Sequence, residues 1–280
     1  MKKILCPVDF SKTSNKAAEY AAHIAQQTGA SLTLLHVLHL PMMDTTESAL
    51  MASQVLDEQR RMAGDKLQSL GMHLQNLFGE GGATFVMDSK VQEAFLADAV
   101  ERLVKEEGFD FVVLGTTGGG NTLEEIMIGS NTESVISQVK CPVLAVPARA
   151  TFPQIHRIVY ASDFMAEDAR ALAKVLELAS FFQAEVEVVH VSKEENAQKA
   201  QAFMEDLRNE LGGYPVRFQP IIHEEEDTGL KDYLSRSNSN MLAILKKRRN
   251  FFKDLFGMSL AEKMTYQTKL PLLVLHEDAL

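Results

Sequence analysis

Residues Gly115 to Thr132 combine glycines and hydroxyl side chains in a pattern that could bind an anion. The segment reads GTTGGGNTLEEIMIGSNT and begins at the last residue of the apolar run FVVLG. Glycines let backbone N–H groups approach a phosphate closely, and a helix starting after Gly129 would add free amides and the positive end of its dipole. The pattern predicts an anion cradle made by Gly115, Gly118, Gly119, Gly120, Gly129, Ser130 and Thr132.

Plainer interpretations of these residues stay open. The glycines could form only a flexible loop, with Ser130 as a helix cap, although their joint placement behind a buried strand favours the phosphate interpretation. A P-loop is excluded because no Gly-Lys-Ser/Thr sequence follows the glycines. Asp9 follows another apolar run and precedes Ser11, so it could shape a turn or contact a ligand.

Alternating strands and helices must position these residues. Continuous apolar strands separated by helices predict parallel sheets covered on both faces, with ligands outside the carboxyl ends of the strands. In the first half the expected strands are residues 2–8, 31–37, 83–87, 110–115 and 141–147, and the expected helices are 11–28, 47–77, 91–107 and 128–139. In the second half the expected strands are residues 156–162, 185–191, 216–222, 241–246 and 270–276.

The chain repeats itself, which predicts two similar domains in tandem. The sequence from Lys2 aligns without a gap with the sequence from His156, including the identical pairs Asp9/Asp163, Phe10/Phe164 and His36/His190. We expect domains at 1–148 and 154–280, joined near PARATFPQ. Each should be an α/β, doubly wound, five-stranded parallel sheet of flavodoxin-like or Rossmann-like order 3-2-1-4-5 with helices on both faces.

Composition excludes several classes of partner. The formal net charge of −10 argues against binding nucleic acid or an anionic membrane through bulk electrostatics. The N-terminal stretch MKKILCPVDF is neither a signal peptide nor a membrane span, and no later apolar run approaches spanning length. Cys6 and Cys141 lie in or beside apolar runs, which favours buried free thiols and a cytoplasmic protein.

The combined motifs resemble the universal stress protein family in a tandem two-domain form. The resemblance is carried by CPVDFS, LTLLHV, the G-x-x-G sequence followed by Gly-Ser, and CPVLAVP. It implies an ATP-binding domain, with AMP or ADP as other candidate ligands and Mg²⁺ carried by the nucleotide. The family's nine-residue interval before Gly-Ser fits Gly119, whereas Gly118 leaves ten residues, so the ribose or phosphate contact could belong to either glycine.

The resemblance assigns binding roles to the residues that match the family's motifs. The resemblance places Pro7, Val8, Asp9 and Val37 around the base and nucleoside. It places the remaining binding residues around ribose and phosphates, namely Gly115, Gly118, Gly119, Gly129, Ser130, Asn131 and Thr132.

The second repeat lacks the glycine cradle. Its corresponding loop carries Lys246, Lys247, Arg248 and Arg249. These residues favour a solvated basic loop over a second anion site. Residues 251–256 (FFKDLF) are expected to pack into the crevice, with a lipid or protein contact as the alternative. His36 and His190 are expected to be packed or hydrogen-bonded imidazoles rather than metal ligands.

Three functional classes stay open from the sequence. The leading class is an ATP-binding regulatory protein of the stress response with one nucleotide in the N-terminal domain; the others are a slow ATPase or phosphotransferase and a nucleotide-free interaction scaffold. No general base, catalytic lysine or arginine finger stands at a recognisable spacing, which disfavours an enzyme.

The apolar final strands near residues 143–146 and 272–275 are expected to pair antiparallel within one chain, and a homodimer of whole chains stays open.

Overall fold

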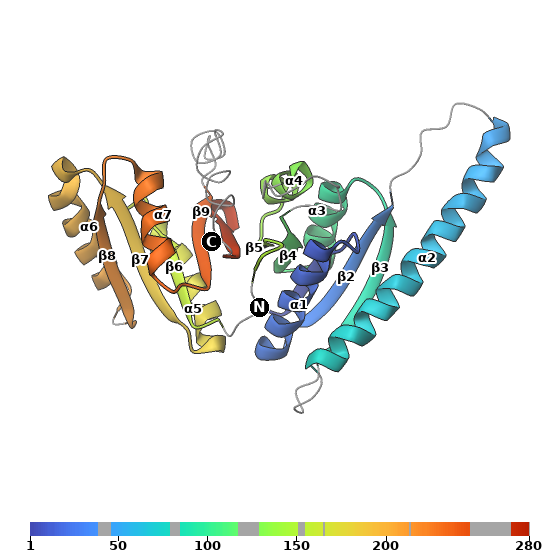
Figure 1. Cartoon of the computed structure of the whole chain (residues 1–280), viewed down its shortest axis with the longest axis horizontal. Helices are drawn as coiled ribbons and strands as arrows, with labels where there is room; N and C mark the ends of the chain where they lie inside the picture. The colour runs from blue at the N-terminus through green and yellow to red at the C-terminus, as the bar shows by residue number, and fades with distance from the viewer. Residues whose placement is uncertain are drawn as a thin grey trace. The chain divides into compact units, whose positions relative to one another are not determined.

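The computed structural model describes residues 1–38, 46–78, 85–116, 129–150, 155–164, 166–212, 214–246 and 270–279. Strands and helices alternate along these residues (Figure 1). The chain divides into two compact units, the first holding the described residues up to Cys141 and the second those from Pro142 onward. The domain bounds 1–148 and 154–280 stay predictions.

The first unit contains parallel strands in the order β3-β2-β1-β4. In the sheet register, Ile4 lies beside Leu32 on one side and Phe111 on the other. The carboxyl ends of these strands therefore meet at one edge, where ligands of open α/β sheets bind. The strands are β1 (Lys3–Pro7), β2 (Ser31–Leu38), β3 (Met87–Glu93) and β4 (Phe111–Gly115).

Helices of the first unit form two layers on this sheet. α1 (Lys12–Thr28) packs with α2 (Thr46–Phe78), whereas α3 (Leu96–Glu107) packs with α4 (Ser130–Gln138). α1 begins at the cap Ser11, whose side chain accepts a hydrogen bond from the Ser14 amide, and ends at Gly29 in the left-handed conformation (φ 69°). A buried stripe of alanines lets α1 approach the strands closely: Ala17, Ala18, Ala21, Ala22 and Ala25.

The second unit repeats the architecture with parallel strands in the order β8-β7-β6-β9-β10. β5 (Val143–Val146) also lies in this unit and pairs antiparallel with β10, Leu144 opposite Leu273. The elements are β6 (Arg157–Ala161), α5 (Asp168–Phe182), β7 (Glu185–Ser192), the 3-10 helix Glu194–Asn196, α6 (Ala197–Glu210), β8 (Val216–Ile222), α7 (Glu226–Arg236), β9 (Met241–Lys246), β10 (Leu272–His276) and the 3-10 helix Glu277–Ala279.

The predicted fold class is confirmed, but the third strand of the first repeat was misplaced. The sequence-based strand at residues 83–87 and the helix start at Val91 are wrong, because β3 spans Met87–Glu93 and α3 begins at Leu96. Among the strands that the structure describes, β3 pairs with β2 alone, and its residues are exposed or half-buried. A strand in that position needs no continuous apolar run, so the apolar pattern pointed to the wrong residues.

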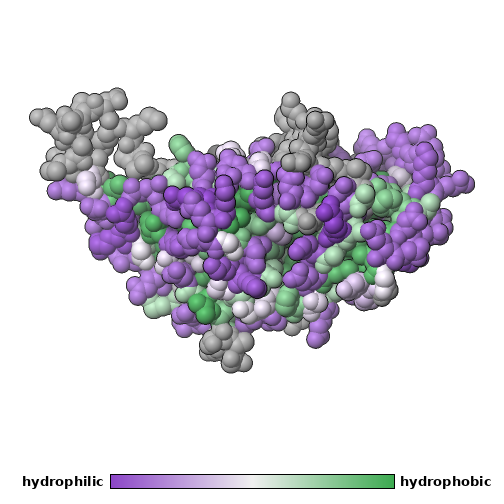
Figure 2. Space-filling model, turned by 180° about the vertical axis from the view of Figure 1, so that it is seen from behind, coloured by the Kyte–Doolittle hydropathy of each residue, from purple (hydrophilic) through white to green (hydrophobic). Residues whose placement is uncertain are grey.

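The core is mainly aliphatic and contains both thiols. Cys6 and Cys141 are buried and free, as the sequence predicted. Burial raises the pKa of Cys6 far above its usual range and, with a smaller contribution from Asp110, raises that of Cys141 to about 12. Both groups are therefore protonated and unreactive at neutral pH. The face drawn in Figure 2 shows hydrophilic residues predominating on the surface.

Candidate functional site

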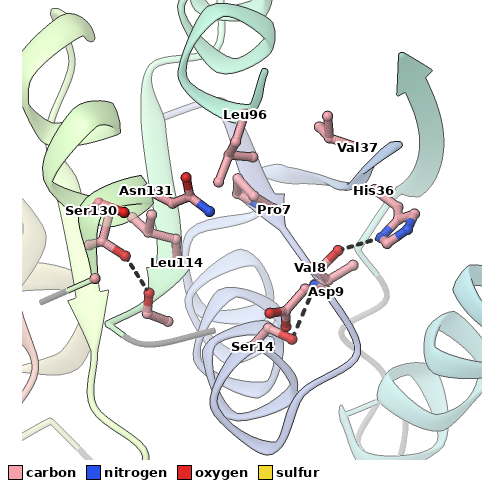
Figure 3. Close-up of a pocket in the computed structure, with 13 residues that line it drawn as sticks. Pro7, Val8, Asp9, Ser14, His36, Val37, Leu96, Leu114, Ser130 and Asn131 are labelled. Atoms are coloured by element: carbon pink, nitrogen blue, oxygen red, sulfur yellow. Dashed lines mark hydrogen bonds between the residues drawn. The ribbon is translucent and has the colours of Figure 1, made fainter. Parts of the chain in front are cut away.

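A cleft of about 250 Å³ lies in the first unit at the carboxyl ends of its strands. Figure 3 shows Ser130 and Asn131 on one side of this cleft, at the start of α4, and His36 and Val37 on the other, at the end of β2. The volume is slightly below the roughly 300–1,000 Å³ typical of small-molecule sites. The lining residues are Pro7, Val8, Asp9, Ser14, His36, Val37, Leu96, Leu114, Gly115, Gly129, Ser130, Asn131 and Thr132.

Every predicted binding residue that the structure describes lines this cleft. Gly118, Gly119 and Gly120 lie outside the described residues. The sequence prediction missed four lining residues as binding candidates: Ser14, His36, Leu96 and Leu114. Leu96 was hidden by the misplaced helix start, whereas the hydroxyl of Ser14, in the first helical turn after Asp9, was a sequence signal that could have identified this residue.

Asp9 shapes the turn between β1 and α1. Its Oδ1 atom accepts a hydrogen bond from the Ser11 amide at 3.0 Å, and its own amide donates to Ser14 Oγ at 3.3 Å. These bonds place the N-terminus of α1 at one wall of the cleft. The turn-shaping role left open by the sequence is thereby observed for Asp9, which also faces the cleft as an exposed residue.

Phe10 completes this turn in a conformation that is unusual for its residue type. Its φ is 63°, in the left-handed region, and its ring packs against His36 with 4.6 Å between the ring centroids. His36 Nδ1 lies 2.7 Å from the Val8 carbonyl oxygen (Figure 3). Because a carbonyl oxygen can only accept, Nδ1 carries the hydrogen. The prediction of a hydrogen-bonded imidazole is confirmed.

Gly115 is required by packing within the first unit. A Cβ atom at this position would lie 2.8 Å from Thr13 Cγ2 and 3.1 Å from the Thr13 backbone carbon. β4 therefore approaches the first turn of α1 more closely than any other residue type would allow. The glycine pattern predicted phosphate access at this position, whereas the contact that excludes a side chain here is with α1.

The start of α4 presents backbone donors and one exposed hydroxyl. The Gly129 amide donates to the Thr116 carbonyl oxygen at 2.7 Å, and Thr132 Oγ1 donates to the Gly115 carbonyl oxygen at 2.9 Å. Thr132 is buried and uses its hydrogen within the fold, contrary to the expectation that it would donate to a ligand. Ser130 and Asn131 are exposed, and the first-turn amides of residues 130–132 point toward the helix N-terminus.

The second unit repeats the turn without repeating the cleft residues. Phe164 has φ 56° and stacks on His190 with 3.5 Å between ring centroids, while His190 Nδ1 donates to the Ser162 carbonyl oxygen at 2.7 Å. The Phe and His residues of both repeats therefore have a shared structural role.

In the second unit, the positions equivalent to those that line the cleft carry different residues. Asp168, the counterpart of Ser14, is buried and accepts hydrogen bonds from Tyr160 Oη at 2.6 Å and Ser162 Oγ at 2.5 Å. Burial, and then the Asp168 carboxylate, raise the pKa of Tyr160. By strand register Leu245 stands where the first unit has Gly115. A buried carboxylate and a leucine thus replace a serine and a glycine.

Metal ligation finds no support in the part of the chain that the structure describes. Its His, Cys, Asp and Glu side chains form no group of three or more placed to hold a metal ion.

The basic loop predicted in the second repeat begins at Lys246, at the end of β9, where burial lowers the pKa of the lysine. The remaining basic residues 247–249 and the FFKDLF segment lie outside the described residues.

Comparison with known proteins identifies the family. Residues 1–147 match the model of the universal stress protein family, and the chain belongs to that family. Universal stress protein MJ0531 of Methanocaldococcus jannaschii is 30% identical over 151 residues, which cover 52% of this chain and 81% of that protein. Universal stress protein YxiE of Bacillus subtilis is 30% identical over 149 residues, covering 51% and 97%.

One solved structure extends the likeness to nearly the whole chain. A universal stress protein from Archaeoglobus fulgidus matches with a TM-score of 0.72 over 98% of both chains, at 17% identity. This match supports the α/β fold over both repeats. None of the helices among the described residues combines the length and apolarity needed to cross a bilayer.

Proposed function

We propose that this chain is an ATP-binding regulatory protein of the stress response that holds one nucleotide in the cleft of its first unit. The observation that carries this proposal is that apolar and hydrogen-bonding residues meet in this cleft. Pro7, Val8, Val37 and Leu96 offer apolar contact for an adenine base. The first turn of α4 offers backbone amides and Ser130 for ribose and phosphate groups.

The glycines at 118 and 119 fit the same proposal by sequence. They precede α4 in the motif through which the universal stress protein resemblance implies ribose and phosphate contacts. Mg²⁺ would accompany ATP through phosphate and water oxygens, and ADP or AMP would occupy the same cleft.

Binding without a dedicated catalytic centre is the role that the cleft supports best. Its titratable side chains among the described residues are Asp9 and His36, and each makes a hydrogen bond that shapes the turn. Neither is set apart to act as a general base. Buried free thiols at Cys6 and Cys141 support a cytoplasmic location.

The second repeat is proposed to act structurally. Asp168 would repel an anionic ligand, and Leu245 places a side chain where the first unit has Gly115. We propose that the β5–β10 ladder couples the repeats, since β5 falls inside the family match of the first repeat and β10 ends the second.

Mass spectrometry of ligand released from protein purified without added nucleotide tests this proposal. Roughly stoichiometric adenine nucleotide is expected. Protein that carries none, and that also fails to take up added ATP, ADP or AMP, would favour the nucleotide-free scaffold instead.

A further inference from the structure

The helix that follows the second strand is much longer in the first unit than in the second. α2 spans 33 residues, whereas α6, which follows β7 in the second unit, spans 14. Gly71 of α2 lies beside Met87 at the start of β3, and Arg60 is ion-paired with Glu93 at its end. The turns of α2 before Arg60 therefore reach past the ends of β2 and β3 (Figure 1). We call residues 46–62 the arm.

The arm leaves apolar side chains exposed to solvent. None of the side chains at residues 53–62, all of which the structure describes, is buried, whereas Leu67 and Leu74 further along α2 are buried. Val55 is 54% exposed and Met62 is 46% exposed. Seven residues separate them, so they lie on one side of the helix, two turns apart. Because helices in proteins owe most of their stability to packing, this unpacked side indicates a docking surface.

The order of charges along the arm favours a second copy of this chain as its partner. Asp57 and Glu58 stand on the N-terminal side of Gln59, and Arg60 and Arg61 stand on its C-terminal side. Two such arms lying antiparallel bring each acidic pair beside the partner's basic pair, whereas parallel arms would bring like charges together. A two-fold dimer interface requires a surface that is complementary to itself in this way.

Two of these charged side chains are accessible to a partner. Glu58 and Arg61 form an ion pair within the helix at 2.5 Å, yet their side chains are 54% and 63% exposed. An exposed pair of this kind contributes at most about 1 kcal/mol within one chain. Both groups can therefore also interact with an opposite charge on a partner at little cost.

We propose that the arm is the contact surface for a second copy of this chain. The two arms pack antiparallel about a two-fold axis near Gln59, which buries Val55 and Met62 and brings Glu58 close to the partner's Arg61. Since α6 is too short to provide a second arm, the contact closes as a dimer. This interface is separate from the β5–β10 ladder within one chain and from the cleft.

Sedimentation equilibrium of the full chain over a series of concentrations tests the proposal. We expect a monomer–dimer equilibrium. Val55→Gln combined with Met62→Gln should raise the dissociation constant of the dimer at least about tenfold, because four apolar side chains per dimer lose their burial. Leu77→Gln is the control, since Leu77 is 50% exposed at the far end of α2 and its replacement should leave the constant unchanged.

Charge reversal tests the antiparallel arrangement. Glu58→Lys and Arg61→Glu each bring like charges together across the two-fold axis, so each variant alone should dimerise at least about threefold more weakly. An equimolar mixture of the two variants should form a heterodimer with roughly wild-type affinity, because opposite charges meet again. Both variants lack the ion pair within the helix, and mixing cannot restore it, so recovery identifies a contact between chains.

Three results would overturn the proposal. The first is a wild-type chain that stays monomeric over the whole series, which would leave a different protein as the occupant of the arm. The second is a dimer whose dissociation constant is unaffected by the Val55 and Met62 replacements. The third is a mixture of the Glu58 and Arg61 variants that recovers no affinity.

Discussion

The hydroxyl of Thr132 donates a 2.9 Å hydrogen bond to the carbonyl oxygen of Gly115, tying the first turn of α4 to the end of β4. Thr132 is buried, whereas its neighbour Ser130 is exposed in the cleft. Two hydroxyls of one helical turn thus have different surroundings, and their removal should have different effects.

Thr132→Val should destabilise the protein, and Ser130→Ala should weaken nucleotide binding. Losing the Thr132 bond leaves a half-buried carbonyl oxygen short of a partner, which costs about 1–3 kcal/mol in the free energy of unfolding. Urea unfolding measures this cost. Thr132→Ser retains the hydroxyl and is the matched control. A Ser130→Ala variant with the larger stability loss would contradict the assignment.

Gly115→Ala should cost about 1–3 kcal/mol of stability, because the new Cβ atom would overlap Thr13 and force β4 away from α1. Gly64→Ala is the control: it lies in α2, where a Cβ atom meets nothing within 4 Å, and it should be neutral or stabilising by up to about 1 kcal/mol. Thermal unfolding of both variants makes the comparison. Equal stability of the two would show that the close approach of β4 to α1 is unimportant.

His23 should contribute a pH-dependent part of the stability. It lies in α1 beside Phe78, and burial lowers its pKa, so the unfolded chain binds its proton more readily than the folded chain. The contribution is present above the unfolded pKa of about 6.5 and is lost as pH falls through that value toward the lower folded pKa. His23→Gln should flatten the wild-type decline in unfolding free energy between about pH 7 and 5. An unchanged slope would argue against this role.

How far the sequence predicts the structure depends on where its constraints lie. β9 occupies the predicted residues because its continuous apolar run reports burial in a sheet, and β8 does so because apolar and polar residues alternate along its first four positions. β3 (MDSKVQE) was misplaced because it contains no apolar run, and its residues are exposed or half-buried.

The candidate site was likewise predicted only in part. The resemblance to the universal stress protein family assigned Asp9, Val37 and Asn131 to one binding site, and all three line the cleft. It could not show that Gly115 is needed by α1, since that contact joins residues about a hundred positions apart and exists only in the fold. The internal bond of Thr132 was hidden for the same reason.

Charged substitutions in the β5–β10 ladder should loosen the coupling between the repeats. Val143 and Leu273 are fully or almost fully buried, in strands that pair antiparallel. Replacing both with lysine places two charges in an apolar environment, so we expect two separate unfolding transitions and faster proteolysis near Arg149. Ile222→Lys, at a partly exposed position of β8, is the control. Single cooperative unfolding of the double variant, with the link still protected, would contradict the coupling.

The most direct test of the central claim is calorimetric titration of the nucleotide-free full chain with ATP in excess Mg²⁺. We predict one site per chain, weakened at least about tenfold by Gly129→Val combined with Ser130→Ala, because these changes alter the N-terminus of α4 where phosphate would bind. Leu245→Val, at the equivalent strand end of the second repeat, should leave the affinity unchanged. Two equal sites per chain, or an affinity that the α4 variant does not alter, would contradict the account.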